Sequence, residues 1–420
     1  MKTALFPCIA AMSATLLAAC APAAHKPAAP VAAPAKETAV SEDPYLWLED
    51  IHGEKPLAWV ETQNARTQAD FADTPAFGKA REAILGILDS DAKIPFVSKI
   101  GDRYYNFWKD KQHPRGVWRR TTLAEYRKDK PNWETVIDLD ALGKAEGKSW
   151  VWHGAQCLKP ADRRCLVSLS PGGGDANVVR EFDLHDKAFV KGGFQLPEAK
   201  TQVAWIDENR IYVATDFGPG SMTKSSYARI VKEWRRGTPL SDATTVYEAK
   251  EDDLAVSASR DLTAGFERDF VQRAIDFYTS ETFVRGKDGQ LVKIDVPLDA
   301  NVDAHREWLT IHLRNAWTVD GKTYPSGALL AAKFDDFMAG QRDLVTLFAP
   351  TDTTSLESAS WTRHHLILNL LDNVASRQEV LTPSAHGNWK REPLAGAPAL
   401  STVVASAVDD DTDDSYFLTV

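Results

Sequence analysis

The chain has 420 residues, of which 44% are hydrophobic and 26% charged, a composition ordinary for a soluble globular protein with a large core. Its net charge is −10, and the charged residues are dispersed without a basic stripe. Because neutralisation of phosphates by Lys and Arg supplies most of the affinity for nucleic acid, this charge argues against a nucleic-acid partner.

The first 19 residues have the pattern of an export signal. Met1-Lys2 gives a short positive start, and the apolar run that follows is too short to span a membrane. Leu17-Ala18-Ala19-Cys20 then resembles the bacterial lipobox, in which the cysteine is lipidated and becomes the first mature residue. We therefore predict a signal peptide over residues 1–19 and a lipid on Cys20. An ordinary secretory signal with an incidental cysteine is the alternative.

Residues 20–42 begin with the lipidated cysteine and continue as an Ala/Pro-rich stretch without periodicity. We expect this stretch to be a semi-extended tether between a membrane anchor and the folded body. Ala21 follows Cys20, and no aspartate stands there to indicate retention in the inner membrane. The predicted location is the bacterial cell envelope, on the periplasmic side, as an outer-membrane lipoprotein.

Residues 43–92 are predicted to form a helical segment. Pro56 begins a stretch that places Leu57, Val60, Asn64, Thr67 and Phe71 on one helical face. Thr74-Pro75 is typical of an N-cap followed by a first-turn proline, and helical spacing of apolar residues follows as far as Leu88. Two amphipathic helices before a β region need a partner surface. The simpler alternative is that they cap the rim of that region.

Residues 93–420 are predicted to be all-β. The part between Ser149 and Gly193 contains four candidate strands separated by turns, which are Trp150–Leu158, Cys165–Ser170, Val178–Leu184 and Ala188–Lys191. Strands so tightly connected pair antiparallel with their neighbours. A four-stranded unit of this kind cannot bury both of its faces alone, so it must stack on similar units.

Similar strand–turn–strand units recur at a spacing of about 50 residues, as in propeller blades. They begin near Phe96, Ser149, Gln202, Leu254, Glu307, Glu357 and Leu400. Seven starts predict a seven-bladed β-propeller preceded by two N-terminal α-helices. A large β-sandwich or two smaller all-β domains would give a similar pattern. The last unit has only two candidate strands, Leu400–Val408 and Ser415–Val420, so we predict an incomplete last blade and a chain truncated within it.

Two cysteines lie on either side of the first turn in the second unit. Counting outward from Ala161 places Cys157 and Cys165 opposite each other on adjacent strands. A cross-strand disulfide therefore fits an oxidising periplasm. Two buried thiols fit the same spacing equally well.

Several stretches resemble the prolyl oligopeptidase family of serine peptidases. DPYLWLED (43–50) and WVETQNA (59–65) resemble the N-terminal signature of that family, and VSLSPGGGDA (167–176), REFDL (180–184) and TDFGPGS (215–221) resemble its propeller. The resemblance covers Asp43 to about Gly237. It implies that the helices pack on a C-terminal α/β-hydrolase domain and that the propeller restricts entry to its active site to short peptides.

The chemistry of that family needs a serine in a Gly-x-Ser-x-Gly elbow, with Asp and His later in the chain. The nearest match, around Ser149, lacks the final glycine and leads into a strand rather than a helix. No βαβ alternation follows Leu400. We therefore predict no catalytic residue in this chain. A hydrolase domain is expected to be missing from it, and the chain alone should not hydrolyse peptides.

Other candidate sites have plainer interpretations. Gly172-Gly173-Gly174 reads as a turn, because no Gly-Lys-Ser/Thr follows and no helix starts there. Asp409–Asp414 resembles the start of a calcium loop, but Asp414 stands where a glycine is needed and no Glu closes the loop, so we expect a solvated turn between two strands. His364-His365 is placed in an apolar strand, where adjacent side chains point to opposite faces and do not share one metal. We expect no cofactor and no metal site.

These observations favour one function. The chain is interpreted as the lipid-anchored helical and propeller region of an exported prolyl oligopeptidase-like peptidase, which gates short peptides toward a hydrolase domain absent from it. Its partners would be that domain, short peptides, and the membrane reached through the lipid. The alternative is a stand-alone envelope propeller that binds a ligand or protein through its central face.

Overall fold

The computed structural model describes residues 43–384, 387–398 and 401–420. The chain divides into two compact units, residues 1–79 and residues 80–420. The predicted signal peptide (1–19), Cys20 and the tether (20–42) lie outside the described residues.

The described part of the first unit is mainly helical. It contains the 3-10 helix η1 (Leu46–Glu49), helix α1 (Glu54–Thr67) and the π-helical segment η2 (Gln68–Ala72), and helix α2 (Pro75–Leu88) begins in it. Thr74 caps α2, because its Oγ1 accepts a hydrogen bond of 3.3 Å from the Phe77 amide. Pro75 in the first turn loses no hydrogen bond, since that amide would be unpaired in any case. The two predicted helices are confirmed.

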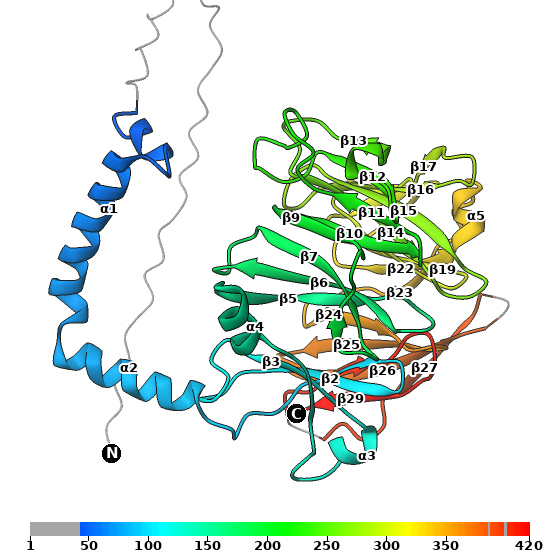
Figure 1. Ribbon diagram of the computed structural model, residues 1–420. Coiled ribbons are helices and arrows are strands. Elements are labelled where there is room, and N and C mark those ends of the chain that lie inside the picture. The colour runs from blue at the N-terminus through cyan, green and yellow to red at the C-terminus, as the bar shows by residue number, and fades with distance from the viewer. Residues whose placement is uncertain (1–42, 385–386, 399–400) are drawn as a thin grey trace, which may run out of the picture. The chain divides into compact units, whose positions relative to one another are not determined.

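The second unit is a series of antiparallel sheets that follow one another along the chain (Figure 1). We call them blades 1 to 7. Blade 1 contains β1 (Ser98–Ile100), β2 (Arg103–Trp108), β3 (Val117–Thr121) and β4 (Glu134–Asp138). Blade 2 contains β5 (Trp150–Cys157), β6 (Arg164–Pro171), β7 (Asn177–Asp183), β8 (Ala188–Phe189) and β9 (Gln195–Ala199). Blade 3 contains β10 (Gln202–Asp207), β11 (Arg210–Ala214), β12 (Ile230–Arg235) and β13 (Thr244–Glu248).

The remaining blades continue the pattern. Blade 4 contains β14 (Ala255–Asp261), β15 (Arg268–Ala274), β16 (Ser280–Arg285) and β17 (Leu291–Lys293). Blade 5 contains β18 (Asn301–His305), β19 (Trp308–His312), β22 (Leu329–Lys333) and β23 (Val345–Phe348), with a separate hairpin of β20 (Trp317–Val319) and β21 (Lys322–Tyr324). Blade 6 contains β24 (Thr354–Trp361), β25 (Leu366–Asp372), β26 (Ala375–Pro383) and β27 (Trp389–Pro393), and blade 7 contains β28 (Val404–Ala407) and β29 (Tyr416–Thr419).

Four short helices lie in the loops of the described part of this unit. They are α3 (Leu123–Tyr126), α4 (Leu139–Glu146), η3 (Leu240–Asp242) and α5 (Phe334–Met338). The sequence analysis predicted none of them. Each is eight residues long or less, which is too short for a helical hydrophobic period to stand out against the strand pattern around it.

The antiparallel order of the strands gives the unit two distinct faces. The turns between the first and second strands of each blade, and between the third and fourth, lie on one face, which we call the hairpin face. The turns between second and third strands and the connections from blade to blade lie on the other, the connection face.

The hydrophobic core lies between neighbouring blades rather than inside any one of them. In the cluster between blades 1 and 2, Trp118 packs with Leu169 and Phe182, and all three side chains are buried. Similar clusters join blades 2 and 3, 3 and 4, 4 and 5, 5 and 6, and 6 and 7. Each sheet therefore uses the apolar faces of its neighbours as its own core, as a propeller requires.

The last blade meets the first. Phe417 of β29 lies against Tyr104 of β2, with ring centroids 6.4 Å apart, and Lys99 of β1 reaches Asp409 beyond β28. Figure 1 shows β29, in red, beside β2, in cyan. The seven sheets thus close into a ring, which confirms the predicted seven-bladed propeller. In the described residues, the seventh blade has two strands, β28 and β29.

Blade 2 shows how closely the predicted strands match. Strands β5 to β8 agree with the four expected between Ser149 and Gly193, but β9 was missed. The outer edge of this blade is split, because the chain bends away at Gly192 between β8 and β9, which pair antiparallel with successive parts of β7. Pro197 is tolerated in β9 because β9 is an edge strand.

Two further predictions concern side chains in the blades. Cys157 and Cys165 are direct cross-strand partners on β5 and β6, and their sulfur atoms form a disulfide. The placement of His364-His365 in a strand is wrong: β24 ends at Trp361 and β25 begins at Leu366, so both histidines lie in the turn between them. The Thr362 amide donates to the carbonyl of His365 at 2.8 Å, which closes this turn.

Candidate functional site

The first strands of the blades surround the axis of the propeller and contribute most of the lining of two cavities, and a third cavity lies between blades 4 and 5. The cavities have volumes of about 420, 540 and 310 Å³. Small residues such as Gly154, Ala155 and Ala258 leave space beside the strands. The 420 Å³ cavity differs from the 540 Å³ cavity in being lined by charged groups of both signs, which include Lys99, Lys159, Asp162, Asp303, Asp409 and Asp410.

Beside the 420 Å³ cavity lies the turn of blade 7, residues 409–414. Its own side chains hold its shape. Asp409 accepts hydrogen bonds from the Asp411 amide at 3.0 Å and from the Thr412 hydroxyl at 2.7 Å, and Asp413 accepts from the Ser415 amide at 2.8 Å. Short polar side chains that bond nearby amides favour turns over strands, which explains why β28 and β29 stop on either side of this segment.

Lysines from blades 1 and 2 contact one side of this turn. Lys99 Nζ lies 2.9 Å from Asp409 Oδ2 and 3.2 Å from Asp413 Oδ2. Lys159, in the turn between β5 and β6, lies 3.6 Å from Asp410 and 3.9 Å from Asp411. Blade 7 is therefore linked to blades 1 and 2 by charge.

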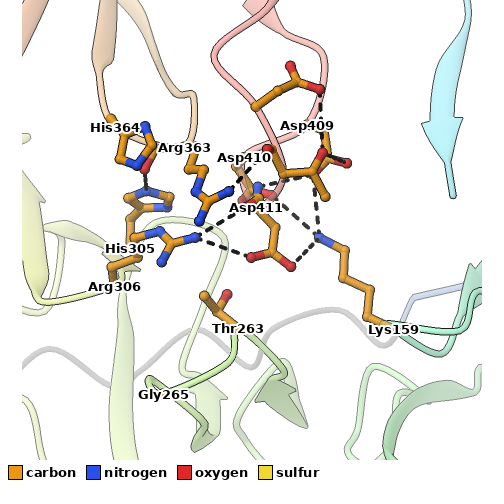
Figure 2. A network of polar contacts seen from close by, with 12 residues as sticks. Lys159, Thr263, Gly265, His305, Arg306, Arg363, His364, Asp409, Asp410 and Asp411 are labelled. Atoms are coloured by element: carbon orange, nitrogen blue, oxygen red, sulfur yellow. Dashed lines mark hydrogen bonds and ion pairs between the residues drawn. The ribbon is translucent and has the colours of Figure 1, made fainter. Parts of the chain in front are cut away.

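Residues from blades 5 and 6 contact the other side of the turn, as Figure 2 shows. Arg306 donates to the carbonyl of Asp411 at 3.1 Å and lies 3.4 Å from its carboxylate. The backbone amide of Arg363 donates to the carbonyl of Asp413 at 3.0 Å. Asp414 accepts from the His364 amide at 2.7 Å and lies 2.8 Å from His364 Nδ1. We call the turn and these partners the blade-7 network.

The network shifts the acidity of its members. Burial alone would raise the pKa of Asp409, but hydrogen bonds from Thr412 and Lys99 outweigh burial and hold that pKa well below its usual range. Burial alone would lower the pKa of Lys99, yet the hydrogen bonds of Lys99 to Asp409 and Asp413 raise that pKa. For Asp414, burial is outweighed by hydrogen bonds from His364 and Thr362, and the pKa falls to about 2. All three groups are therefore charged at neutral pH.

Asp303 differs from these carboxylates. It projects from β18 into the axial space and lines both the 420 and the 310 Å³ cavity. Burial raises its pKa, because protein surrounds it on the walls of the cavity. Within the described chain, no Lys or Arg forms an ion pair with it.

Ser149, the nearest match to an elbow serine, does not lie in such an elbow. Ser149 lies between α4 and the first residue of β5, so its surroundings are those of a strand and not of an elbow that leads into a helix. Among the same residues, no group of three or more His, Cys, Asp and Glu is placed to hold a metal ion. No helix of the described chain is long and apolar enough to cross a membrane.

Sequence reasoning identified residues 409–414 as a turn but missed the partners of that turn. Lys99 and Lys159 precede it by about 250 residues or more, and no local pattern connects such distant positions. One signal was available. Lys159, Arg306 and Arg363 each stand in the turn between the first and second strands of a blade, so an alignment of the blades would have placed all three on one face.

Comparison with known proteins identifies the family. The model of the prolyl oligopeptidase N-terminal β-propeller domain matches residues 24–417. The chain belongs to this prolyl oligopeptidase propeller family. The family resemblance predicted from the motifs is confirmed.

Two relatives of this chain show what share of a longer protein it matches. A peptidase of Sinorhizobium fredii, y4nA, is 35% identical over 393 residues, which are 91% of this chain and 54% of that protein. The structure of a post-proline cleaving enzyme from Rickettsia typhi is 28% identical, with a TM-score of 0.80, and the match covers 89% of this chain and 56% of that one. The chain spans about half the length of these relatives.

A more distant structure shares the fold. Oligopeptidase B from Leishmania major is 15% identical, with a TM-score of 0.63, over 83% of this chain and 48% of that one. The prolyl oligopeptidase propeller is thus retained at low sequence identity, as expected when the pattern of interblade packing matters more than individual residues.

We predict that Asp414 makes the free energy of unfolding depend on pH in the acidic range. Its folded-state pKa of about 2 lies below the value of about 4 for an unfolded aspartate. Its contribution is therefore present above about pH 4 and is lost as the pH falls toward 2. Asp414→Asn should lower the free energy of unfolding at pH 7 by about 1 kcal/mol, a figure discounted for a side chain that is 35% exposed.

Urea unfolding between pH 7 and pH 3 checks this prediction. The loss of stability with acid should be smaller in Asp414→Asn than in the unmodified chain. Asp252→Asn is the control, because Asp252 forms an exposed pair with Lys224 and should change the free energy of unfolding by less than about 0.5 kcal/mol. Parallel pH profiles for the unmodified chain and Asp414→Asn would contradict the assignment.

Proposed function

We propose that the chain is the propeller region of a prolyl oligopeptidase-like peptidase, and that it gates access of short peptides to an α/β-hydrolase domain. The family membership and the names of the relatives support this proposal. The relative from Sinorhizobium fredii is a peptidase, and the one from Rickettsia typhi is a post-proline cleaving enzyme. Both are about twice as long as the matched region, which leaves room in them for a second domain.

The observation that carries the proposal is the distribution of exposed apolar side chains. On the connection face they include Phe277, which is 86% exposed, and Val374, which is 92% exposed, together with Ile94, Phe96, Tyr278, Leu298 and Val404. In the described hairpin-face turns, none of the large hydrophobic side chains is exposed. Apolar groups gathered on one face of a protein mark an interaction surface. We infer that the hydrolase domain docks on the connection face.

The most prominent of these groups is held in a fixed turn. Phe277 and Tyr278 lie between β15 and β16, where Asp276 accepts hydrogen bonds of 2.7 and 2.8 Å from the amides of Tyr278 and Thr279. Arg314 of blade 5 lies 4.1 Å from the centre of the Tyr278 ring. A turn that is ordered before binding loses less entropy on docking, which favours it as a contact.

The axial cavities support the gating role. The two at the axis measure about 420 and 540 Å³, which is space for a few residues of extended chain and not for a folded protein. A peptide that reaches a domain on the connection face along this axis would therefore be short or unfolded.

Docking is tested with the double variant Phe277→Ser/Tyr278→Ser. The binding partner in this test is the part of the Sinorhizobium fredii peptidase that this chain does not match, and that part is produced separately. The unmodified chain should bind that partner, and the double variant should raise the dissociation constant by at least about tenfold, because aromatic contacts dominate interfaces. Isothermal titration calorimetry measures both.

The matched control is Lys287→Ser, which lies in the hairpin-face turn of the same blade. It should leave the dissociation constant unchanged. Equal weakening by both variants, or no association of the unmodified chain, would contradict docking on the connection face.

We also propose that the chain is exported and anchored in the envelope through Cys20. The lipobox-like Leu17–Cys20 supports this, and so does the Cys157–Cys165 disulfide, since disulfides persist in oxidising compartments. Bacteria that express the full chain should incorporate labelled palmitate into it. Cys20→Ser should abolish the label while Cys8→Ser retains it. Label that persists in Cys20→Ser would refute the anchor.

A further inference from the structure

We propose that the blade-7 network is an electrostatic latch. In this proposal the turn 409–414 holds blade 7 in the ring and covers the axial channel on the hairpin face. The inference goes beyond the proposed function and does not depend on it.

The first argument concerns the junction that closes the ring, between blades 7 and 1. The clusters between successive blades from 1 to 6 each contain at least nine buried residues, whereas the cluster between blades 6 and 7 contains three, Ile367, Leu394 and Ala405. In the described chain, the buried clusters join consecutive blades and none joins blade 7 to blade 1. At that junction Phe417 contacts Tyr104 and Tyr126. The ion pair between Lys99 of blade 1 and Asp409 of blade 7, 2.9 Å long, lies at the same junction.

The second argument is the reach of the turn. One carboxylate, that of Asp411, lies 3.4 Å from Arg306 Nη2 and 3.9 Å from Lys159 Nζ. Arg306 belongs to blade 5 and Lys159 to blade 2, and these blades face each other across the ring. A group that contacts both must lie over the axis. Figure 2 shows the turn between Lys159 on one side and Arg306 and Arg363 on the other.

The third argument is that the charges of the turn are already matched. Its aspartates contact the side chains of Lys99, Lys159 and Arg306, and a histidine besides. A cation site would need carboxylates that are free to coordinate a metal. Here the carboxylates already pair with basic side chains, so the arrangement is suited to join blades rather than to bind an ion.

The strength of the latch depends on salt. The Lys99–Asp409 pair is well shielded, since both side chains are 13% exposed, whereas Lys159 is 40% exposed. Exposed pairs are screened by salt much more than shielded ones. Salt should therefore weaken the contact of blade 7 with blade 2 before that with blade 1.

The test is hydrogen exchange measured by mass spectrometry on the full chain. In Lys159→Gln/Arg306→Gln, the amides of β28 and β29 should exchange at least about tenfold faster, while those of blades 3 and 4 keep their rates. Lys224→Gln removes an exposed ion pair elsewhere and should change neither set. In the unmodified chain, raising NaCl from about 0.05 to about 1 M should accelerate exchange in β28 and β29 alone.

The exchange rates of β28 and β29 decide whether the latch proposal holds. Faster exchange confined to blade 7, in the double variant and at high salt, supports the latch. Unchanged exchange in β28 and β29 would overturn it. Equal acceleration in all blades would also overturn it, because the charges would then stabilise the fold in general and not blade 7. If the double variant fails to fold, the salt series on the unmodified chain gives the same decision.

Discussion

The packing of one sheet against the next is the interaction on which this structure depends. A four-stranded antiparallel sheet has two faces to bury, and each blade buries them on the blades before and after it. Trp118, Leu169 and Phe182 illustrate the arrangement, since side chains from two blades form one core. Because every core is shared, no blade is independent of its neighbours, and the first and last blades must meet. Where they meet, the Phe417 ring contacts Tyr104 and Lys99 pairs with Asp409.

The same strand order makes the two faces of the propeller different in chemistry. The hairpin face carries the short turns, and these bring Lys159, Arg306 and Arg363 toward the aspartates of blade 7. The connection face carries exposed apolar groups such as Phe277 and Val374. We propose that the turn 409–414 covers the axial cavity on the first face, and that a hydrolase domain docks on the second. Both interpretations follow from which turns lie on which face.

Much of the fold could be predicted because strand patterns are local. Six of the seven blade starts, the four strands β5 to β8 and the two strands of blade 7 are visible as short apolar runs separated by turn residues. The start predicted near Glu307 is wrong, because the first strand of blade 5, β18, begins at Asn301. Strand β9 was missed because its start depends on the turn at Gly192. The two histidines were misplaced because apolar residues flank them, although Asp414, far along the chain, holds His364 in a turn. The blade-7 network could not be predicted for the same reason: its ion pairs join residues that only the closed ring brings together.

The measurement that tests this account most directly is hydrogen exchange of the chain with and without the unmatched part of the Sinorhizobium fredii peptidase. The account predicts that this partner protects the connection-face turns, above all residues 275–279 and 373–374, and leaves the turn at 409–414 unchanged. Protection of the turn at 409–414 with no protection at Phe277 or Val374 would contradict it, because the partner would then occupy the hairpin face.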